Sequence, residues 1–226
     1  MNALLITGTD TEIGKTVLTA ALAAYWQRYQ RHRSLGLMKP IQAGLGDREL
    51  YNQLFSLEQS LAEITPLYFD LPLAPPIAAA RAGREVELGL VWQALEHLCS
   101  SRDWVLVEAL GGLGSPVSDE LTVADLAADW RLPTVLVVPV RLGAIAQAVA
   151  NVALARSTRV HLKGIVLNCV QPCSEQEIAD WAPVELIQSL TCTPVLGCLP
   201  YLDNPYDLSK LAQVASDLDL EHLLPL

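Results

Sequence analysis

A glycine-framed loop near the N-terminus constrains the fold of this chain more than any other feature. Residues 8–16 read Gly-Thr-Asp-Thr-Glu-Ile-Gly-Lys-Thr and follow the apolar run Ala3-Leu4-Leu5-Ile6. Gly8 and Gly14 let the loop curl so that backbone N–H groups point into one concavity, and a helical pattern follows directly. Five residues separate these glycines, where the common phosphate loop has four. The flanking strand and helix patterns disfavour a chance glycine turn, so the stretch predicts a loop that binds ATP or GTP.

Short apolar runs alternate with helical patterns along the chain. The runs are apolar on both faces, as strands buried in a parallel sheet are. They lie at residues 3–7, 35–38, 104–107, 134–138, 164–170 and 195–199, and the helical patterns at 16–30, 48–59, 88–99, 123–129, 144–156, 175–189 and 207–220. The alternation predicts an α/β fold, a single-domain, doubly wound and mostly parallel sheet of the P-loop nucleoside triphosphate hydrolase type over residues 1–226. Ligands of such sheets bind beyond the carboxyl ends of the strands.

Composition restricts the partners and the compartment. The chain has 226 residues, a formal net charge of −10, and 51% hydrophobic against 18% charged residues. Because nucleic-acid backbones require a basic face, we expect no nucleic-acid partner. The apolar runs are too short to span a bilayer and no leader pattern opens the chain, so we expect no membrane association and a cytoplasmic protein. Five cysteines without a Cys-x-x-Cys pair indicate reduced, mostly buried thiols and no structural zinc.

Charged side chains stand at the carboxyl ends of two predicted strands. Lys39 follows the second strand, where Pro40 fixes the exit of the chain; it is either an anion clamp or a solvated loop lysine. Glu108 ends the third strand, where a buried carboxylate needs a partner such as Mg²⁺; the alternative is a salt-bridged or solvated glutamate at the strand end. Asp47 is either a second metal ligand or the N-cap of a helix that begins at Arg48, and its spacing favours the cap.

Later strand ends carry candidate groups for a carboxylate and a base. Leu142 and Gly143 precede a helix whose free backbone N–H groups suit a carboxylate, although an ordinary glycine-bearing helix start reads the same way. Asn168 follows the fifth strand, and Pro200-Tyr201-Leu202 follows the sixth. A side-chain amide can form hydrogen bonds with the edge of adenine, and an apolar turn can line the pocket of the base. Each feature is also typical of an ordinary loop. The proline-rich residues 72–76 are expected to form a loop over the crevice or the surface.

Taken in order, these segments resemble the dethiobiotin synthetase family over nearly the whole chain. The resemblance rests first on the loop at residues 8–16, on Lys39-Pro40, and on Val107-Glu108 followed by Gly111-Gly112. Weaker matches are Pro72–Ala80, Leu142-Gly143, Asn168 and Gly197-Cys198-Leu199-Pro200. The extra residue between the loop glycines is specific to this family and its near relatives.

The resemblance implies a homodimeric, ATP- and Mg²⁺-dependent ligase of biotin synthesis. Such an enzyme closes the ureido ring of dethiobiotin from 7,8-diaminononanoate and CO₂. One amine is carbamated, ATP phosphorylates the carbamate, and the second amine attacks the mixed anhydride and expels phosphate. Positioning and charge neutralisation carry most of this chemistry, so no base of unusual strength is required.

The resemblance also implies a role for each matching residue. The implied catalytic residues are Lys39, Lys15 and Thr11. The implied ATP contacts are Glu12, Ile13, Gly14, Lys15, Thr16, Val17, Asp47, Glu108, Ala109, Leu110, Gly111, Asn168, Cys169, Pro200, Tyr201 and Leu202. Thr16, Asp47 and Glu108 are the implied Mg²⁺ ligands. The implied substrate contacts are Lys39, Ala43, Leu142 and Gly143, the last two being contributed in the family by the partner subunit.

Four positions depart from the family pattern. Ala43 stands where a serine or threonine is frequent, with Gln42 as a candidate replacement for the hydroxyl. Leu110 is bulkier than the usual alanine, and Cys169 and Tyr206 stand where acidic residues are frequent. Since the last two positions lie near the expected base and ribose, the sequence leaves the choice of nucleotide open.

Two alternatives share the predicted fold. Another small-molecule amide- or ureido-forming ligase, such as a cobyrinate amidating synthetase, carries a glutaminase domain for which this chain has no room. A nucleotide switch of the ParA/MinD type has a lysine near the first loop glycine, where this chain has Thr9, Asp10 and Thr11. The predicted C-terminal helix is acidic, unlike a basic membrane-targeting helix. Both alternatives are therefore disfavoured.

Overall fold

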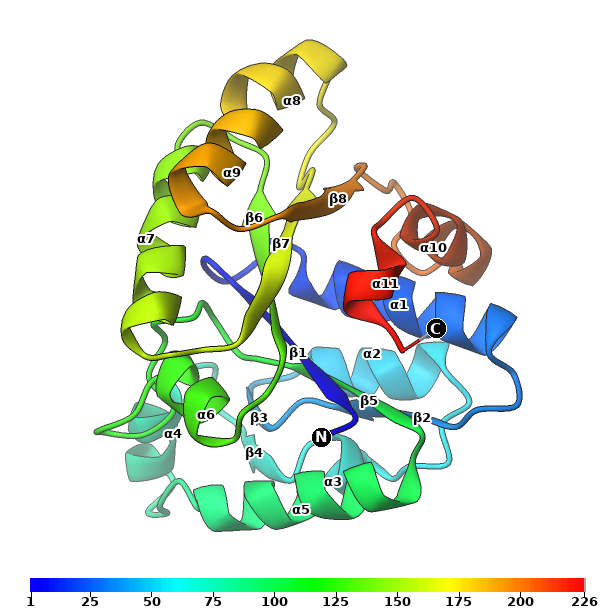
Figure 1. Cartoon of the computed structure of the whole chain (residues 1–226). Helices are drawn as coiled ribbons and strands as arrows, with labels where there is room; N and C mark the ends of the chain where they lie inside the picture. Colours follow the sequence, from blue (N-terminus) through cyan, green and yellow to red (C-terminus); the bar gives the residue numbers. More distant parts are fainter. Residues whose placement is uncertain (226) are drawn as a thin grey trace.

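A six-stranded parallel sheet runs through the centre of the computed structural model, which describes residues 1–225 (Figure 1). The strands are β1 (Ala3–Gly8), β2 (Leu35–Met38), β5 (Trp104–Glu108), β6 (Thr134–Pro139), β7 (Leu162–Asn168) and β8 (Val195–Leu199). Their order in the sheet is β2-β5-β1-β6-β7-β8. A separate parallel pair is formed by β3 (Ile41–Ala43) and β4 (Leu67–Phe69). The predicted α/β class with a mostly parallel, doubly wound sheet is confirmed.

Helices cover both faces of the sheet (Figure 1). One face carries α1 (Lys15–Tyr29), α2 (Asp47–Leu54), α3 (Leu61–Ile64), α10 (Leu208–Ala215) and α11 (Leu220–Leu223). The other carries α4 (Pro75–Arg81), α5 (Leu88–Ser101), α6 (Val123–Asp129), α7 (Ala144–Ser157) and α9 (Val184–Thr191), and α8 (Glu175–Trp181) precedes α9. Within the described residues, no helix is long and apolar enough to cross a membrane.

The central strand shows why the strand runs are apolar throughout. In β1, Leu4 and Ile6 pack into the core on the α1 side, whereas Ala3 and Leu5 pack into the core beneath α5 and α6. All four side chains are at most 1% exposed. Because successive side chains of a strand point to opposite faces, a sheet covered on both faces requires apolar residues at consecutive positions.

The strand order brings three strand ends to one place. β1 lies between β5 and β6, and β5 lies between β1 and the edge strand β2. In the parallel register Ile6 is level with Glu108, and Met38 is level with Val107. The loop that follows Gly8 therefore emerges beside Lys39 and Glu108. This is the crevice at the carboxyl ends of the strands, where doubly wound sheets bind their ligands.

Three of the predicted helices end earlier than expected, and the one predicted at 207–220 ends at Ala215 in α10. The pattern at 175–189 forms two helices, because α8 ends at Trp181 and α9 begins at Val184. Pro183 between them has no N–H to donate and its ring is incompatible with a helix interior. The helix predicted at 48–59 ends at Leu54, where Phe55 takes an extended conformation with φ −117° and ψ 133°.

The prediction of a loop at 72–76 is wrong for its last two residues. α4 begins at Pro75, with prolines at its first two positions. Proline is tolerated there because the first helical N–H groups have no partner within the helix. The short elements β3, β4 and α3 were not predicted, since three or four residues are too few to show a period.

A side chain closes the β2 edge of the sheet. β2 is an edge strand, so the backbone groups of Leu37 have no further strand to pair with. The buried amide of Gln59 takes that place: its Nε2 donates to the Leu37 carbonyl at 3.0 Å, and its Oε1 accepts from the Leu37 N–H at 2.9 Å. Because a free strand edge is a template for aggregation, this contact protects the strand that leads to Lys39.

We predict that Gln59→Ala lowers the free energy of unfolding by about 2–4 kcal/mol, because it leaves two buried backbone groups of Leu37 without partners. Urea titration followed by circular dichroism measures this change. Gln53→Ala, on the exposed side of α2, is the matched control and should change stability by less than about 0.5 kcal/mol. Equal effects of the two substitutions would contradict the assigned role of Gln59.

Candidate active site

The glycine-framed loop joins β1 to α1 and is folded by its own residues. Glu12 and Gly14 adopt left-handed backbone conformations, with φ of 56° and 95°. The Lys15 ammonium reaches back over the loop and donates to the Asp10 carbonyl at 2.7 Å. Left-handed residues turn successive N–H groups toward one side, so the loop has the shape of an anion cradle at the start of α1.

Asn168 at the end of β7 fastens this loop to the far half of the sheet. Its Nδ2 donates to the Ile13 carbonyl at 2.9 Å. A Cβ on Gly14 would lie 2.0 Å from the same nitrogen, so only glycine fits at that position. The Oδ1 atom of Asn168 is buried and has no hydrogen-bond partner among the described residues. The amide therefore offers a free acceptor beside the loop.

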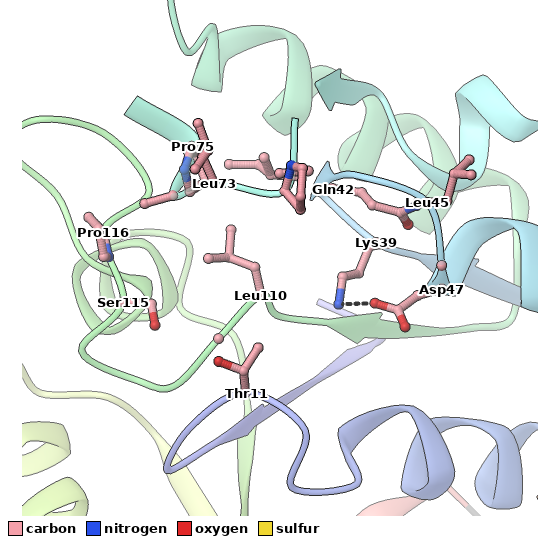
Figure 2. A pocket seen from close by; sticks show the side chains of 16 residues that line it. Thr11, Lys39, Gln42, Leu45, Asp47, Leu73, Pro75, Leu110, Ser115 and Pro116 are labelled. Atoms are coloured by element: carbon pink, nitrogen blue, oxygen red, sulfur yellow. Dashed lines mark ion pairs between the residues drawn. The ribbon is translucent and has the colours of Figure 1, made fainter. Parts of the chain in front are cut away.

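Four side chains from three parts of the sequence meet at the floor of the crevice. The Lys39 Nζ lies 2.6 Å from Asp47 Oδ2 and 2.7 Å from Glu108 Oε1 (Figure 2 draws the pair with Asp47). The Thr16 Oγ1 lies 3.1 Å from both Asp47 Oδ1 and Glu108 Oε1. Lys39 and Glu108 are 5% and 1% exposed. Glu108 is therefore salt-bridged and buried rather than solvated in this structure.

The charges of this cluster support one another. Burial alone would lower the pKa of Lys39, but the carboxylates of Glu108 and Asp47 raise that pKa above its ordinary value. Burial alone would raise the pKa of Asp47, but Lys39 and the Thr16 hydroxyl hold it below its ordinary value. Lys39 and Asp47 therefore form an ion pair at neutral pH.

Lys15 behaves differently from Lys39. Burial lowers the pKa of Lys15 to about 8, although Glu108 attracts the ammonium. The Lys15 side chain has a backbone carbonyl as its hydrogen-bond partner, whereas Lys39 is held by two carboxylates. An anion in the loop would supply the counter-charge that Lys15 lacks.

The oxygen atoms of Thr16, Asp47 and Glu108 fit the requirements of Mg²⁺. They are hard donors, and the hydroxyl oxygen of Thr16 lies within 3.1 Å of an oxygen of each carboxylate. Asp47 is not the helix N-cap that its spacing favoured, because Gly46 occupies that position and α2 begins at Asp47. The Gly46 N–H instead bonds the Glu49 carboxylate at 3.0 Å, which leaves Asp47 free to face Thr16 and Lys39.

A cavity of about 420 Å³ opens above Lys39 and Asp47 (Figure 2). Its lining residues are Thr11, Lys39, Ile41, Gln42, Ala43, Leu45, Gly46, Asp47, Pro72, Leu73, Ala74, Pro75, Leu110, Gly111, Ser115 and Pro116. Figure 2 shows Leu73, Leu110 and Pro116 on the side away from the ion pair. The proline-rich segment thus lies over the crevice, which was one of its two expected positions.

Gln42 is not free to replace the missing hydroxyl at Ala43. Its Nε2 donates to the Gly44 carbonyl at 3.0 Å and to Glu49 Oε2 at 2.9 Å, and its Oε1 accepts from the Arg48 N–H at 2.9 Å. The amide holds the turn that leads into α2. Its contribution to the cavity is therefore structural.

A second cavity, of about 280 Å³, lies on the other side of the glycine loop. It is lined by Glu12, Gly14, Val17, Asn168, Cys169, Val170, Pro200, Tyr201, Leu202, Asp203 and Pro205. The structure thus brings together the strand ends that the sequence nominated for a base. Leu142 and Gly143 line neither of the two cavities: Gly143 caps α7 with φ 95°, and Leu142 is 87% exposed.

The thiols near the second cavity ionise less readily than a free cysteine. Cys169 Sγ lies 3.9 Å from Cys198 Sγ, and burial raises the pKa of both thiols. All five cysteines are free, as expected, but only Cys169 is fully buried and Cys192 is exposed, so the expectation that most are buried is wrong.

One contact of the cluster escaped the sequence analysis. Tyr51 lies one turn after Asp47 on α2, is completely buried, and donates its hydroxyl to Glu108 Oε2. The four-residue spacing from Asp47 is the signal that places both side chains on one face of the helix.

We predict that Gly14→Ala opens the contact with Asn168 and weakens nucleotide binding by about tenfold or more, since the alanine costs about 1–3 kcal/mol in a left-handed conformation. Calorimetric titration with ATP measures the affinity. Gly89→Ala on α5, where no atom lies within 4 Å of the added Cβ, is the control and should leave the affinity unchanged. Unchanged affinity in Gly14→Ala would show that the loop tolerates a shifted Asn168.

Sequence comparison finds relatives over the full length of the chain. A family model described as an AAA domain matches residues 2–205. A protein of Gloeothece citriformis named ATP-dependent dethiobiotin synthetase BioD is 62% identical over 226 residues, with 100% of both chains covered. Proteins of the same name from Crocosphaera subtropica and Bacillus cereus are 56% and 30% identical, over 99% and 96% of this chain and 100% and 90% of their own.

Solved structures of lower identity share the fold. The MinC:MinD cell division protein complex of Aquifex aeolicus matches with a TM-score of 0.59 at 17% identity, covering 100% of this chain and 98% of that chain. A ParA family ATPase from Chlorobium tepidum matches with a TM-score of 0.58 at 15% identity, covering 98% and 97%. At these identities the likeness concerns the P-loop fold alone.

Proposed function

The chain belongs to the ATP-dependent dethiobiotin synthetase family, and we propose that it closes the ureido ring of dethiobiotin from 7,8-diaminononanoate, CO₂ and ATP. The position of Lys39 carries this proposal. Its buried ammonium lies at the base of a 420 Å³ cavity and next to the phosphate loop, so it can face an anion formed on the substrate and the phosphoryl group that the anion receives.

Each part of the ATP molecule has a matching part of the crevice. The loop from Glu12 to Val17 receives the phosphates, with Lys15 as their cation, and Ala109 to Gly111 lie along the same strand end. The second cavity, with Cys169 and Pro200 to Leu202 in its wall, receives the base. Thr11 lines the first cavity and lies on the loop, so it stands between the phosphates and the substrate (Figure 2).

The free acceptor of Asn168 supports adenine as the base. One N–H of its Nδ2 donates to the Ile13 carbonyl, and its Oδ1 atom has no partner among the described residues and can accept a hydrogen bond. The exocyclic amine of adenine donates, whereas the corresponding oxygen of guanine would face Oδ1 as a second acceptor. We therefore propose ATP as the preferred nucleotide.

Mg²⁺ would be held by Thr16, Asp47 and Glu108, and it would neutralise charge on the phosphates. Lys39 at present bridges the two carboxylates, so metal binding requires its ammonium to give up at least one of them. If the Lys39 ammonium left Asp47 or Glu108, it would move toward the first cavity, which Lys39 and Asp47 line. The same residue thus serves the metal site and the substrate site in turn.

The proposed reaction proceeds in three steps. One amine of the substrate forms a C–N bond to CO₂ and loses a proton, giving a carbamate. A carbamate oxygen forms a bond to the γ-phosphorus of ATP, and ADP leaves. The second amine then bonds to the carbonyl carbon of this mixed anhydride and loses a proton, the C–O bond to phosphate breaks, and the ring closes as phosphate leaves. Lys39 stabilises negative charge on the carbamate and on the transferring phosphoryl group.

Two further assignments concern the assembly. We propose that the chain acts as one ATP-binding domain over residues 1–226 in a cytoplasmic homodimer without nucleic-acid partners. In that dimer, Leu142 and Gly143 would present backbone N–H groups to the substrate carboxylate in the neighbouring subunit. Their exposed position at the start of α7 supports this role, as does their absence from the lining of the subunit's own two cavities.

The direct test is phosphate release by the purified protein with MgATP and bicarbonate, with and without 7,8-diaminononanoate. Release that depends on the diamine, with one dethiobiotin formed per phosphate, is the expected result. Slow release that is indifferent to the diamine would contradict the proposal and would favour a nucleotide switch or another substrate.

We predict that Lys39→Ala lowers kcat by about 100-fold or more, because it removes the cation that faces the transferring group. Lys15→Ala should cause a similar loss, accompanied by weaker ATP binding. Steady-state kinetics at saturating substrates measure both effects. Lys210→Ala, an exposed lysine of α10, is the control. Near-normal turnover of the Lys39 variant would exclude its assigned role.

We predict that Asn168→Ala weakens ATP binding by about tenfold while kcat at saturating ATP changes less, because the variant loses the proposed acceptor for the base and the anchor of the loop but no group at the reacting atoms. Calorimetry with ATP and GTP measures the affinity and the preference. Asn52→Ala, exposed on α2, is the control. Equal affinity of the wild-type protein for GTP and ATP would contradict the adenine assignment.

A further inference from the structure

The two oxygen atoms of the Glu108 carboxylate face different surroundings. Oε1 points into the crevice, where Lys39 Nζ lies at 2.7 Å and Thr16 Oγ1 at 3.1 Å. Oε2 points the other way and accepts the hydroxyl of Tyr51. Glu108 itself is 1% exposed and Tyr51 is 0% exposed, so no solvent competes for either oxygen.

Tyr51 is well fixed in this position. Its ring belongs to the hydrophobic core between α1 and the sheet, together with Ile6 and Leu106. A phenol hydroxyl has one proton to donate and the carboxylate Oε2 is an acceptor, so the hydroxyl is the donor of this contact. The ring cannot turn away without leaving the core, and the contact with Oε2 is therefore persistent.

We propose that Tyr51 is a positioning residue that limits Glu108 to metal ligation through Oε1 alone, and that it thereby favours Mg²⁺ over Ca²⁺. This inference rests on the metal site of the proposed function. Mg²⁺ takes six ligands in a strict octahedron and is satisfied by one oxygen of a carboxylate. Ca²⁺ takes six to eight oxygens and gains from a carboxylate that binds through both of its oxygens. A carboxylate with one oxygen committed to a phenol withholds the additional ligand that only the larger ion can use.

The test replaces Tyr51 by phenylalanine, which keeps the ring and removes only the hydroxyl. The full chain is titrated calorimetrically with a non-hydrolysable ATP analogue at saturating Mg²⁺ and, separately, at saturating Ca²⁺. The measured quantity is the Kd with Ca²⁺ divided by the Kd with Mg²⁺. We expect this ratio to fall by about threefold to tenfold in Tyr51→Phe, the scale of one ligand–oxygen interaction.

Tyr25→Phe is the matched control. Tyr25 lies on α1, where its ring centroid is 4.7 Å from that of Tyr29, and the substitution removes the same hydroxyl away from the carboxylates. Its ratio of Kd values should equal that of the wild-type protein. A role of Tyr51 in packing alone would lower the melting temperature of Tyr51→Phe and leave the ratio unchanged.

The outcomes separate this inference from the proposed function. Nucleotide binding that depends on the metal, with the same ratio in wild type and Tyr51→Phe, overturns the role of Tyr51 only. Nucleotide binding by the wild-type protein that is indifferent to both metals overturns the metal site and the inference together. If Tyr51→Phe fails to fold, Tyr51→Met, which also fills the core without a donor, is measured in the same way, and an unchanged ratio there overturns the inference.

Discussion

The ammonium of Lys39 between the carboxylates of Asp47 and Glu108 is the contact on which the arrangement of the crevice depends. It joins the end of β2, the start of α2 and the end of β5, which the sequence separates by up to 69 residues. A buried charge is tolerated only with a partner, and removing one member of such a group leaves the others unpaired at a cost of about 3–5 kcal/mol. The register of β2 against β5 sets this contact, and Gln59 maintains β2 at the edge of the sheet.

A second connection ties the two halves of the crevice together. Asn168 reaches from β7 to the backbone of the glycine loop, and the absence of a side chain at Gly14 makes room for it. The loop is thus fixed to the same strand end that lines the second cavity. In the proposed function, binding of a base and binding of phosphates would therefore be coupled through one amide, since movement of Asn168 would displace the loop.

The main elements could be predicted from sequence because their signals are local. Apolar runs gave the six strands of the main sheet, and the glycine loop with Lys39 and Glu108 marked the strand ends. Contacts between distant residues carry no such signal. Tyr51 and Glu108 are 57 residues apart in the sequence. The sequence of α2 indicates that the helix is polar, but not which carboxylate the helix faces in the fold. From spacing alone, the helix N-cap was the favoured role of Asp47, because only the fold brings Thr16 and Lys39 close to it. The prediction of one helix at 175–189 missed the break at Pro183, which separates α8 from α9.

The shape of the first cavity bears on how a long diamine could be selected. Its charged groups, Lys39 and Asp47, lie at one end, and Leu73 and Leu110 lie toward the other (Figure 2). Gln42 is fully occupied by the turn before α2, so it adds no polar contact beside Ala43. The carbon chain of such a substrate would then be bound by apolar contacts, which contribute about 25 cal/mol of binding free energy per Å² of buried apolar surface. In the proposed function, the ion pair would mark where the reacting end of the substrate lies, the carbon chain would lie against the apolar residues, and the carboxylate at the far end would face the partner subunit.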